Sequence, residues 1–213
     1  MVSVRLLAPV SRRFFERPPD PVASDLVGMW LVVHDHDEER RALIVETEAY
    51  GGSDDPASHS FRGPTKRSEI MFGPAGYLYV YLIYGMHWCM NIVTERTGTA
   101  SAVLLRAAEL HVPTLGGDDV VALRGPGNLT RGLGISGADS GLDCCAGEGR
   151  HLTIHRSSAR GVTWPTAQSK RIGITREVDR PSRYFLDGHP AVSKAPSSAT
   201  TTKRSSHKGG RSV

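Results

Sequence analysis

The chain has 213 residues, 39% of them hydrophobic and 23% charged, which fits one globular domain and excludes a largely disordered protein. Its formal charge of +4 comes from the C-terminus, because the stretch from Gly188 to Val213 holds five Lys or Arg residues and no acid. The remainder carries 21 basic and 22 acidic residues, so a polyanion would have to be held by a local patch or by the basic C-terminal stretch.

Neither an oxidising compartment nor a membrane is indicated. The three cysteines are odd in number and two are adjacent, which is poor material for a disulfide framework. The longest apolar run, 77–93, is interrupted by glycine, histidine and asparagine and does not resemble a membrane span. We therefore expect a soluble cytoplasmic protein.

In chain order, the first predicted element is a helix with Asp20 as its N-cap and Gly28 at its end. Strands at 29–33 and 42–50 follow as a hairpin around a polar loop. The segment 51–64 is rich in turn-forming residues and long for a simple connection, which makes it a candidate functional loop.

The run YLYVYLIY at 77–84 is the strongest strand pattern, and 88–93 is expected to pair with it beyond Gly85. A short helix with Asn128 as cap is predicted after Arg124. Further strands are predicted at 102–107, 151–155, 171–174 and 183–186. Strands outnumber helices and follow one another closely, which predicts an α+β domain with a mostly antiparallel sheet.

Strand alternation places Glu46, Glu48 and Tyr50 on one face. A half-buried carboxylate there could serve as a general base for water. The alternative is an edge strand with a solvated polar face, and the pattern treats the two carboxylates as equal candidates.

The tyrosine-rich strand supplies flat aromatic faces suited to stacking on nucleobases, or else a core strand with satisfied hydroxyls. Alternation places Tyr81 and Tyr84 on opposite faces, and Gly85 beyond Tyr84 indicates that this tyrosine projects at a turn. A projecting tyrosine is a candidate wedge into a base stack. The HDHD sequence at 34–37 is interpreted as a solvated turn, since no further metal ligand lies nearby in the sequence.

The string VETEAYGGSDDPASHSFRGPTKRSEIMFGPAGYLYVYLIYGMHWCMNIV, at 45–93, closely resembles the alkyladenine (3-methyladenine) DNA glycosylase family. The resemblance extends to AVLLRA at 102–107, GPGNLTRGLGI at 125–135 and RYFLDGHPAVS at 183–193. It implies a curved, open, barrel-like sheet with packed helices. It also implies a glycosylase domain at 15–193, preceded by an N-terminal arm at 1–14. The Ser, Thr, Gly and Lys composition of 194–213 predicts a disordered basic tail.

The resemblance implies an enzyme that flips a damaged purine out of duplex DNA and hydrolyses the bond between base and sugar in base excision repair. By motif position, Glu48 would be the general base, and Arg106 would lie near the attacking water and the DNA phosphate. The residues that match those enclosing the flipped base are Tyr50, His59, Tyr81 and Asn91. Tyr84 matches the tyrosine that fills the vacated stack.

The expected substrates are the 3-methyladenine, hypoxanthine and ethenoadenine class in double-stranded DNA, processed by a monomer without metal or cofactor. Lys66 and Lys170 are the only lysines before the tail and neither falls at a site motif, so a monofunctional hydrolase is expected. The alternatives are a non-catalytic nucleic-acid binding protein with an aromatic stacking strand, and an enzyme acting on carbohydrate through Glu46 and Glu48.

Overall fold

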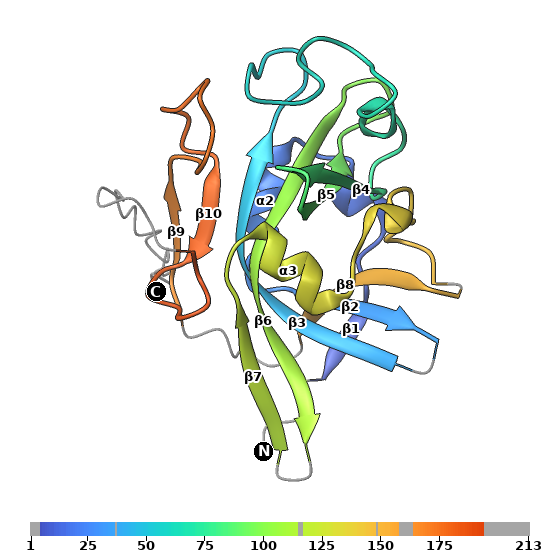
Figure 1. The fold of residues 1–213 in the computed structure, drawn as a ribbon, viewed down its shortest axis with the longest axis vertical. Coiled ribbons are helices and arrows are strands. Elements are labelled where there is room, and N and C mark those ends of the chain that lie inside the picture. Colours follow the sequence, from blue (N-terminus) through green and yellow to red (C-terminus); the bar gives the residue numbers. More distant parts are fainter. Residues whose placement is uncertain (1–4, 37, 115–116, 148, 158–163, 194–213) are drawn as a thin grey trace, which may run out of the picture.

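A computed structural model describes residues 5–36, 38–114, 117–147, 149–157 and 164–193 (Figure 1). The strands are β1 (Leu6–Pro9), β2 (Trp30–Asp35), β3 (Glu38–Tyr50), β4 (Leu78–Ile83), β5 (His87–Thr94), β6 (Ser101–Thr114), β7 (Gly117–Leu123), β8 (His151–Ser157), β9 (Thr166–Ser169) and β10 (Arg183–Leu186). The helices are α1 (Arg12–Phe15), α2 (Pro19–Leu26) and α3 (Pro126–Leu133), with 3-10 turns η1 (Glu69–Phe72) and η2 (Gly137–Asp139).

All strand pairs of the described chain are antiparallel, and the main path runs β1-β8-β2-β3-β6-β5-β4. The long strands β3 and β6 change partners along their length. The first half of β3 pairs with β2 and its second half with β10, while β6 passes from β5 to β7. Because register shifts at 44–47 bend β3, the sheet curves without closing on itself. The α+β expectation is confirmed.

The largest buried hydrophobic cluster of the described residues lies between the sheet and its helices. Val22, Ala23 and Leu26 of α2 are fully buried, as are Leu129 and Leu133 of α3. Helix α2 contacts β3 and β6, and α3 contacts β5 and β6. The helices therefore fix the two strands, β3 and β6, that carry the candidate carboxylates and Arg106.

The predicted hairpins 29–33/42–50 and 77–84/88–93 are confirmed as β2–β3 and β4–β5. The N-cap prediction for Asp20 is wrong, because α2 begins at Pro19. The Asp20 carboxylate instead accepts hydrogen bonds from Arg180 and from the Tyr184 hydroxyl. Gly28 follows the end of the helix with φ 87°, as expected for a glycine that terminates a helix.

Two further predictions are wrong. Asn128 lies inside α3, where its amide donates to the Arg124 carbonyl, and Gly125 occupies the cap position. Residues 171–174 form no strand and bend at 172–173, because Gly173 has φ 75° and the Arg171 side chain turns inward. Strands β1, β7 and β9 were not predicted.

The segment 51–64 contains no helix or strand, as its composition predicts. The expected basic tail at 194–213 lies outside the described residues. In the part of the chain that the structure describes, no helix has the length and apolar character needed to cross a membrane.

Candidate active site

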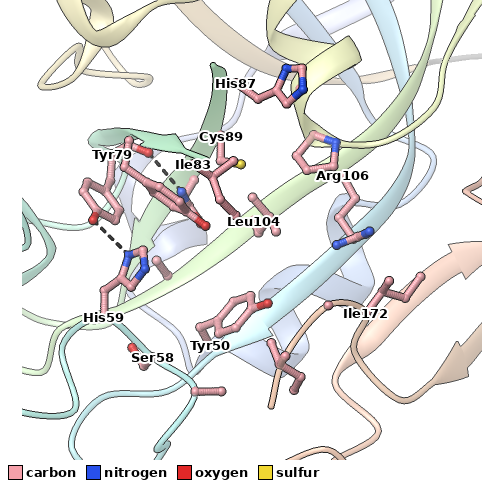
Figure 2. A pocket seen from close by; sticks show the side chains of 18 of the residues that line it. Tyr50, Ser58, His59, Tyr79, Ile83, His87, Cys89, Leu104, Arg106 and Ile172 are labelled. Carbon is pink, nitrogen blue, oxygen red and sulfur yellow. Dashed lines mark hydrogen bonds between the residues drawn. The ribbon is translucent and has the colours of Figure 1, made fainter. Parts of the chain in front are cut away.

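A cavity of about 830 Å³ opens over β4, β5 and β6, beneath the loop 51–64 (Figure 2). Six of the seven predicted site residues line it, namely Tyr50, His59, Tyr81, Tyr84, Asn91 and Arg106. Tyr84 stands at its rim, and Glu48 lies behind its wall. The structure therefore brings the whole predicted set to one place.

One wall of this cavity is aromatic. Alternation along β4 points Tyr79 and Tyr81 to the same side, with ring centroids 5.4 Å apart. The loop brings the His59 ring against Tyr81 at 4.5 Å, and His59 Nδ1 lies 3.0 Å from the Tyr79 hydroxyl. Burial, with a contribution from the Arg67 charge, lowers the pKa of His59, so the imidazole is held neutral near pH 7. Such a wall suits a flat heterocycle.

The facing wall is Tyr50, at the end of β3. Its hydroxyl donates to Glu48 Oε2 at 2.9 Å, and its ring carries the Arg171 guanidinium on one face, 4.7 Å from the centroid. Burial and the neighbouring carboxylate raise the pKa of Tyr50, which keeps the hydroxyl protonated as a donor.

Glu48 is fully buried. Its carboxylate accepts from the Ile172 backbone N–H at 2.7 Å, from Tyr50 and from Arg106 Nη1 at 3.3 Å. Burial raises the pKa of Glu48, and the Arg106 charge and these hydrogen bonds oppose the shift. A desolvated carboxylate whose ionised form is stabilised by nearby donors is suited to general base work.

Glu46, the equal candidate by pattern, has a different environment. Its Oε1 accepts from Arg183 Nε at 2.6 Å and from Arg106 Nε at 3.1 Å, and its Oε2 accepts from the Ser193 N–H at 2.8 Å. Neither carboxylate lines the cavity, but the Tyr50 hydroxyl at the cavity wall donates to Glu48 and not to Glu46. The two cationic partners and the backbone donor of Glu46 connect β3 to β6, to β10 and to the residues that follow β10.

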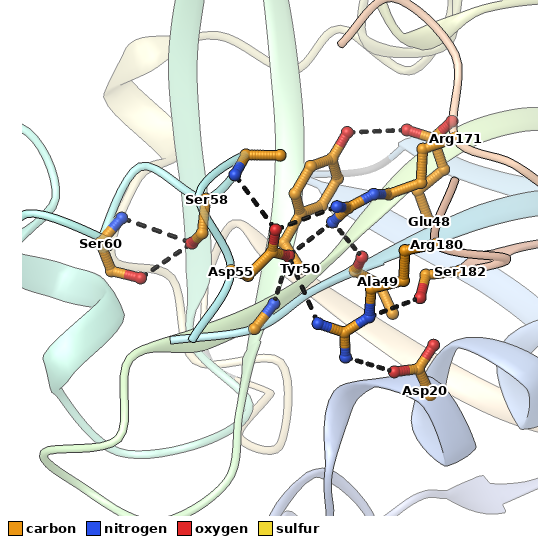
Figure 3. A network of polar contacts seen from close by, with 12 residues as sticks. Asp20, Glu48, Ala49, Tyr50, Asp55, Ser58, Ser60, Arg171, Arg180 and Ser182 are labelled. Carbon is orange, nitrogen blue, oxygen red and sulfur yellow. Dashed lines mark hydrogen bonds and ion pairs between the residues drawn. The ribbon is translucent and has the colours of Figure 1, made fainter. Parts of the chain in front are cut away.

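A buried polar network supports the Tyr50 wall from outside (Figure 3). Arg171 Nη1 and Nη2 donate to the two Asp55 oxygens at 2.5 and 2.9 Å, and Nη1 also donates to the Ala49 carbonyl at 3.0 Å. Asp55 accepts from the Gly51 and Ala57 N–H groups as well. The pair thus joins the loop that carries His59 to the segment that presents the Ile172 N–H to Glu48.

Asn91 is buried, and its amide donates to the Tyr79 carbonyl at 3.1 Å, which fixes its direction at the cavity. Tyr84 is 80% exposed. It and Gly85 both have positive φ, 52° and 68°, so the turn ends the strand alternation and projects the ring from the protein. The prediction that Tyr84 projects at a turn is confirmed.

Sequence reasoning missed four contributors. Tyr79 shares the alternation face of Tyr81, so the pattern could have indicated it. The Ile172 N–H is a backbone donor, and the Arg171–Asp55 pair spans 116 positions, so no local pattern reveals either. The described residues contain no group of three or more ligand side chains arranged for a metal ion.

An open antiparallel sheet with an aromatic cavity and a buried carboxylate behind its wall defines an enzyme site for a planar ring substrate. The model of the methylpurine-DNA glycosylase family matches residues 13–190, and the chain belongs to this family. It is a DNA N-glycosylase, as the resemblance implied.

Relatives carrying the name "Putative 3-methyladenine DNA glycosylase" match most of the chain. One from Synechococcus sp. (strain JA-3-3Ab) is 45% identical over 191 residues, covering 84% of this chain and 96% of the relative. One from Rhodopseudomonas palustris (strain HaA2) is 44% identical, covering 87% and 90%. One from Rickettsia conorii (strain ATCC VR-613 / Malish 7) is 40% identical, covering 84% and 91%.

Proposed function

We propose that this protein flips alkylated or deaminated purines out of double-stranded DNA and hydrolyses their N-glycosidic bond. The substrate class is 3-methyladenine, hypoxanthine and ethenoadenine. The observation that carries the proposal is the position of Glu48, buried directly behind Tyr50 at an aromatic cavity. Extrusion is required because the sugar carbon is inaccessible within the stack.

In the proposed reaction, ionised Glu48 removes a proton from water while the water oxygen bonds to the sugar C1′ and the bond from C1′ to the base nitrogen breaks. The electron pair of that bond leaves with the base. The negative carboxylate also stabilises the positively charged, oxocarbenium-like sugar. A cationic base becomes neutral on leaving, whereas a neutral base needs an added proton.

Arg106 links the candidate general base to the cavity. Its Nη1 donates to Glu48 and its Nε to Glu46, so the guanidinium keeps Glu48 ionised while lining the cavity itself. Because Glu48 has no exposed surface, water reaches it in this proposal only when substrate binding moves Tyr50 or Arg106.

The remaining residues serve extrusion and selection. Tyr50 stacks on one side of the base, with His59 and Tyr81 on the other. Tyr84, exposed at its turn, fills the gap left in the duplex. Asn91, held by the Tyr79 carbonyl, crowds the exocyclic amino group of guanine.

Local basic residues have to hold the DNA, since the chain before Gly188 is slightly acidic. The proposed DNA-contacting set is Arg62, Lys66, Arg67, Arg106 and Arg131, assisted by the basic tail. We place the protein on chromosomal DNA in the cytoplasm or nucleoid, as a monomer.

The proposed chemistry is monofunctional. Neither Lys66 nor Lys170 lines the cavity, and Lys170 is paired with Asp179. The test is incubation with an end-labelled duplex that carries hypoxanthine or 3-methyladenine. Free base and an intact strand that breaks only after alkali are expected. Strand scission without alkali or heat would contradict the monofunctional reaction, and tight binding without base release would favour the stacking-module alternative.

A further inference from the structure

Both aromatic walls of the cavity have a guanidinium over a ring face. Arg171 lies 4.7 Å from the Tyr50 centroid, and Arg67 lies 4.9 Å from the Tyr81 centroid. Neither arginine lines the cavity. Each wall therefore presents a tyrosine toward the substrate with a cation close to its ring.

The two guanidinium groups differ in whether a carboxylate neutralises their charge. Arg171 is buried and forms a bidentate pair with Asp55, which cancels most of its field. Arg67 is exposed and donates through Nη2 to the Leu82 carbonyl at 3.1 Å. Within the described ranges, no carboxylate lies at ion-pair distance from Arg67. Its charge consequently acts on the cavity through the Tyr81 ring.

A cation beside an aromatic ring draws electron density away from the ring and opposes positive charge on the far face. The same charge contributes to the lowered pKa of His59, so it already disfavours a second cation in this wall. The damaged purines of the proposed function differ in charge, because 3-methyladenine is positively charged in DNA and hypoxanthine is neutral.

We infer that Arg67 sets the charge preference of the cavity, favouring neutral damaged purines over positively charged ones. This inference rests on the proposed function and assigns Arg67 as a specificity-determining residue that does not contact the reacting atoms. It implies that the protein gives up some affinity for cationic lesions, which leave readily, and retains affinity for neutral lesions, which leave slowly.

The size of the effect follows from distance. Stacking at about 3.5 Å on the far face of Tyr81 places the base about 8 Å from the Arg67 guanidinium, whose ring distance is 4.9 Å. The guanidinium is exposed, so the effective dielectric constant between it and the base lies between those of protein and water. At this distance, removing the charge changes the ratio of cationic-base release to neutral-base release about fivefold.

The test is a competition between two labelled duplexes of the same sequence, one carrying 3-methyladenine and one hypoxanthine, with limiting enzyme. Arg67→Met and Arg67→Gln are each expected to raise the ratio of 3-methyladenine to hypoxanthine release about fivefold. Arg67→Lys keeps the charge and should leave the ratio within twofold of wild type. Lys66→Met is the matched control, because it removes the adjacent exposed cation, and it too should leave the ratio unchanged.

Because the ratio is measured within one preparation, general losses of stability or DNA affinity cancel. An unchanged ratio in both neutral variants would overturn the inference, as would an equal shift in Lys66→Met. If wild type releases neither base, the proposed function itself fails. If it releases both and only the ratio fails to move, the proposed function stands and the role of Arg67 is refuted.

Discussion

Replacing Asp55 by alanine should destabilise the protein more than any other single change in the loop 51–64. Both Asp55 and the Arg171 side chain have no solvent exposure, and the carboxylate accepts two hydrogen bonds from the guanidinium and two from backbone N–H groups. Removing it leaves a buried guanidinium without its counter-charge. Breaking a buried pair in this way costs about 3–5 kcal/mol of the free energy of unfolding.

Urea unfolding measures this cost directly, and a loss of that size in a domain of this length lowers the thermal midpoint by roughly 6–20 °C. Asp54→Ala is the matched control, because Asp54 is the exposed neighbour and should change stability by less than about 0.5 kcal/mol. The double variant Asp55→Ala/Arg171→Met should lose less than the sum of the two single variants, since no unpaired charge remains.

A loss below about 1 kcal/mol in Asp55→Ala would refute this reasoning, because it would mean that the guanidinium finds water or another partner. Exact additivity in the double variant would refute it independently. The Arg171–Asp55 pair would then lose its place as the support for Tyr50 and for the Ile172 N–H.

Three more predictions concern the candidate site and the tail. Tyr50→Phe removes a hydrogen-bond donor that stabilises ionised Glu48, so the pKa of Glu48 should rise further. Because base release needs ionised Glu48, the loss of activity on acidification should begin at a higher pH than in wild type. An unmoved acid limb in single-turnover pH profiles would contradict the role of Tyr50. Tyr84→Ala should change the free energy of unfolding by less than about 0.5 kcal/mol, because the ring is 80% exposed. The variant should lower the equilibrium constant for base flipping in duplex DNA about tenfold, as measured with a fluorescent base analogue. Flipping by the variant to the same extent as wild type would exclude the wedge role. Deleting 196–213 removes four basic residues and should reduce the salt slope of DNA binding without changing single-turnover chemistry; an unchanged slope would exclude the tail from DNA binding.

The elements that sequence predicted well are those whose pattern is local. The alternation of 77–84 and the glycine after Tyr84 predict the β4–β5 hairpin and the exposure of that tyrosine. Strand β7 forms a hairpin with the preceding β6, but it begins with a glycine and two aspartates, and β9 has only four residues. Their polar or short patterns therefore gave little indication of a strand. The 171–174 prediction failed because Arg171 is turned inward to an aspartate more than a hundred positions away.

The candidate site divides in the same way. Alternation places Glu46, Glu48 and Tyr50 on one face but cannot choose between the carboxylates. What distinguishes the two carboxylates is their hydrogen-bond donors. Arg183 and the Ser193 N–H donate to Glu46, and the Ile172 N–H donates to Glu48. These three contacts come from the C-terminal third of the chain and could not be read from the β3 pattern. The preference for Glu48 came from the family resemblance, and it stays a prediction.

The most direct test of the account compares wild type with Glu48→Gln in single-turnover release of hypoxanthine and 3-methyladenine from labelled duplex DNA. Wild type is expected to release both bases, and the variant is expected to bind the damaged duplex but to release neither. Release by Glu48→Gln at the wild-type rate would contradict this expectation and make Glu46 the next carboxylate to change.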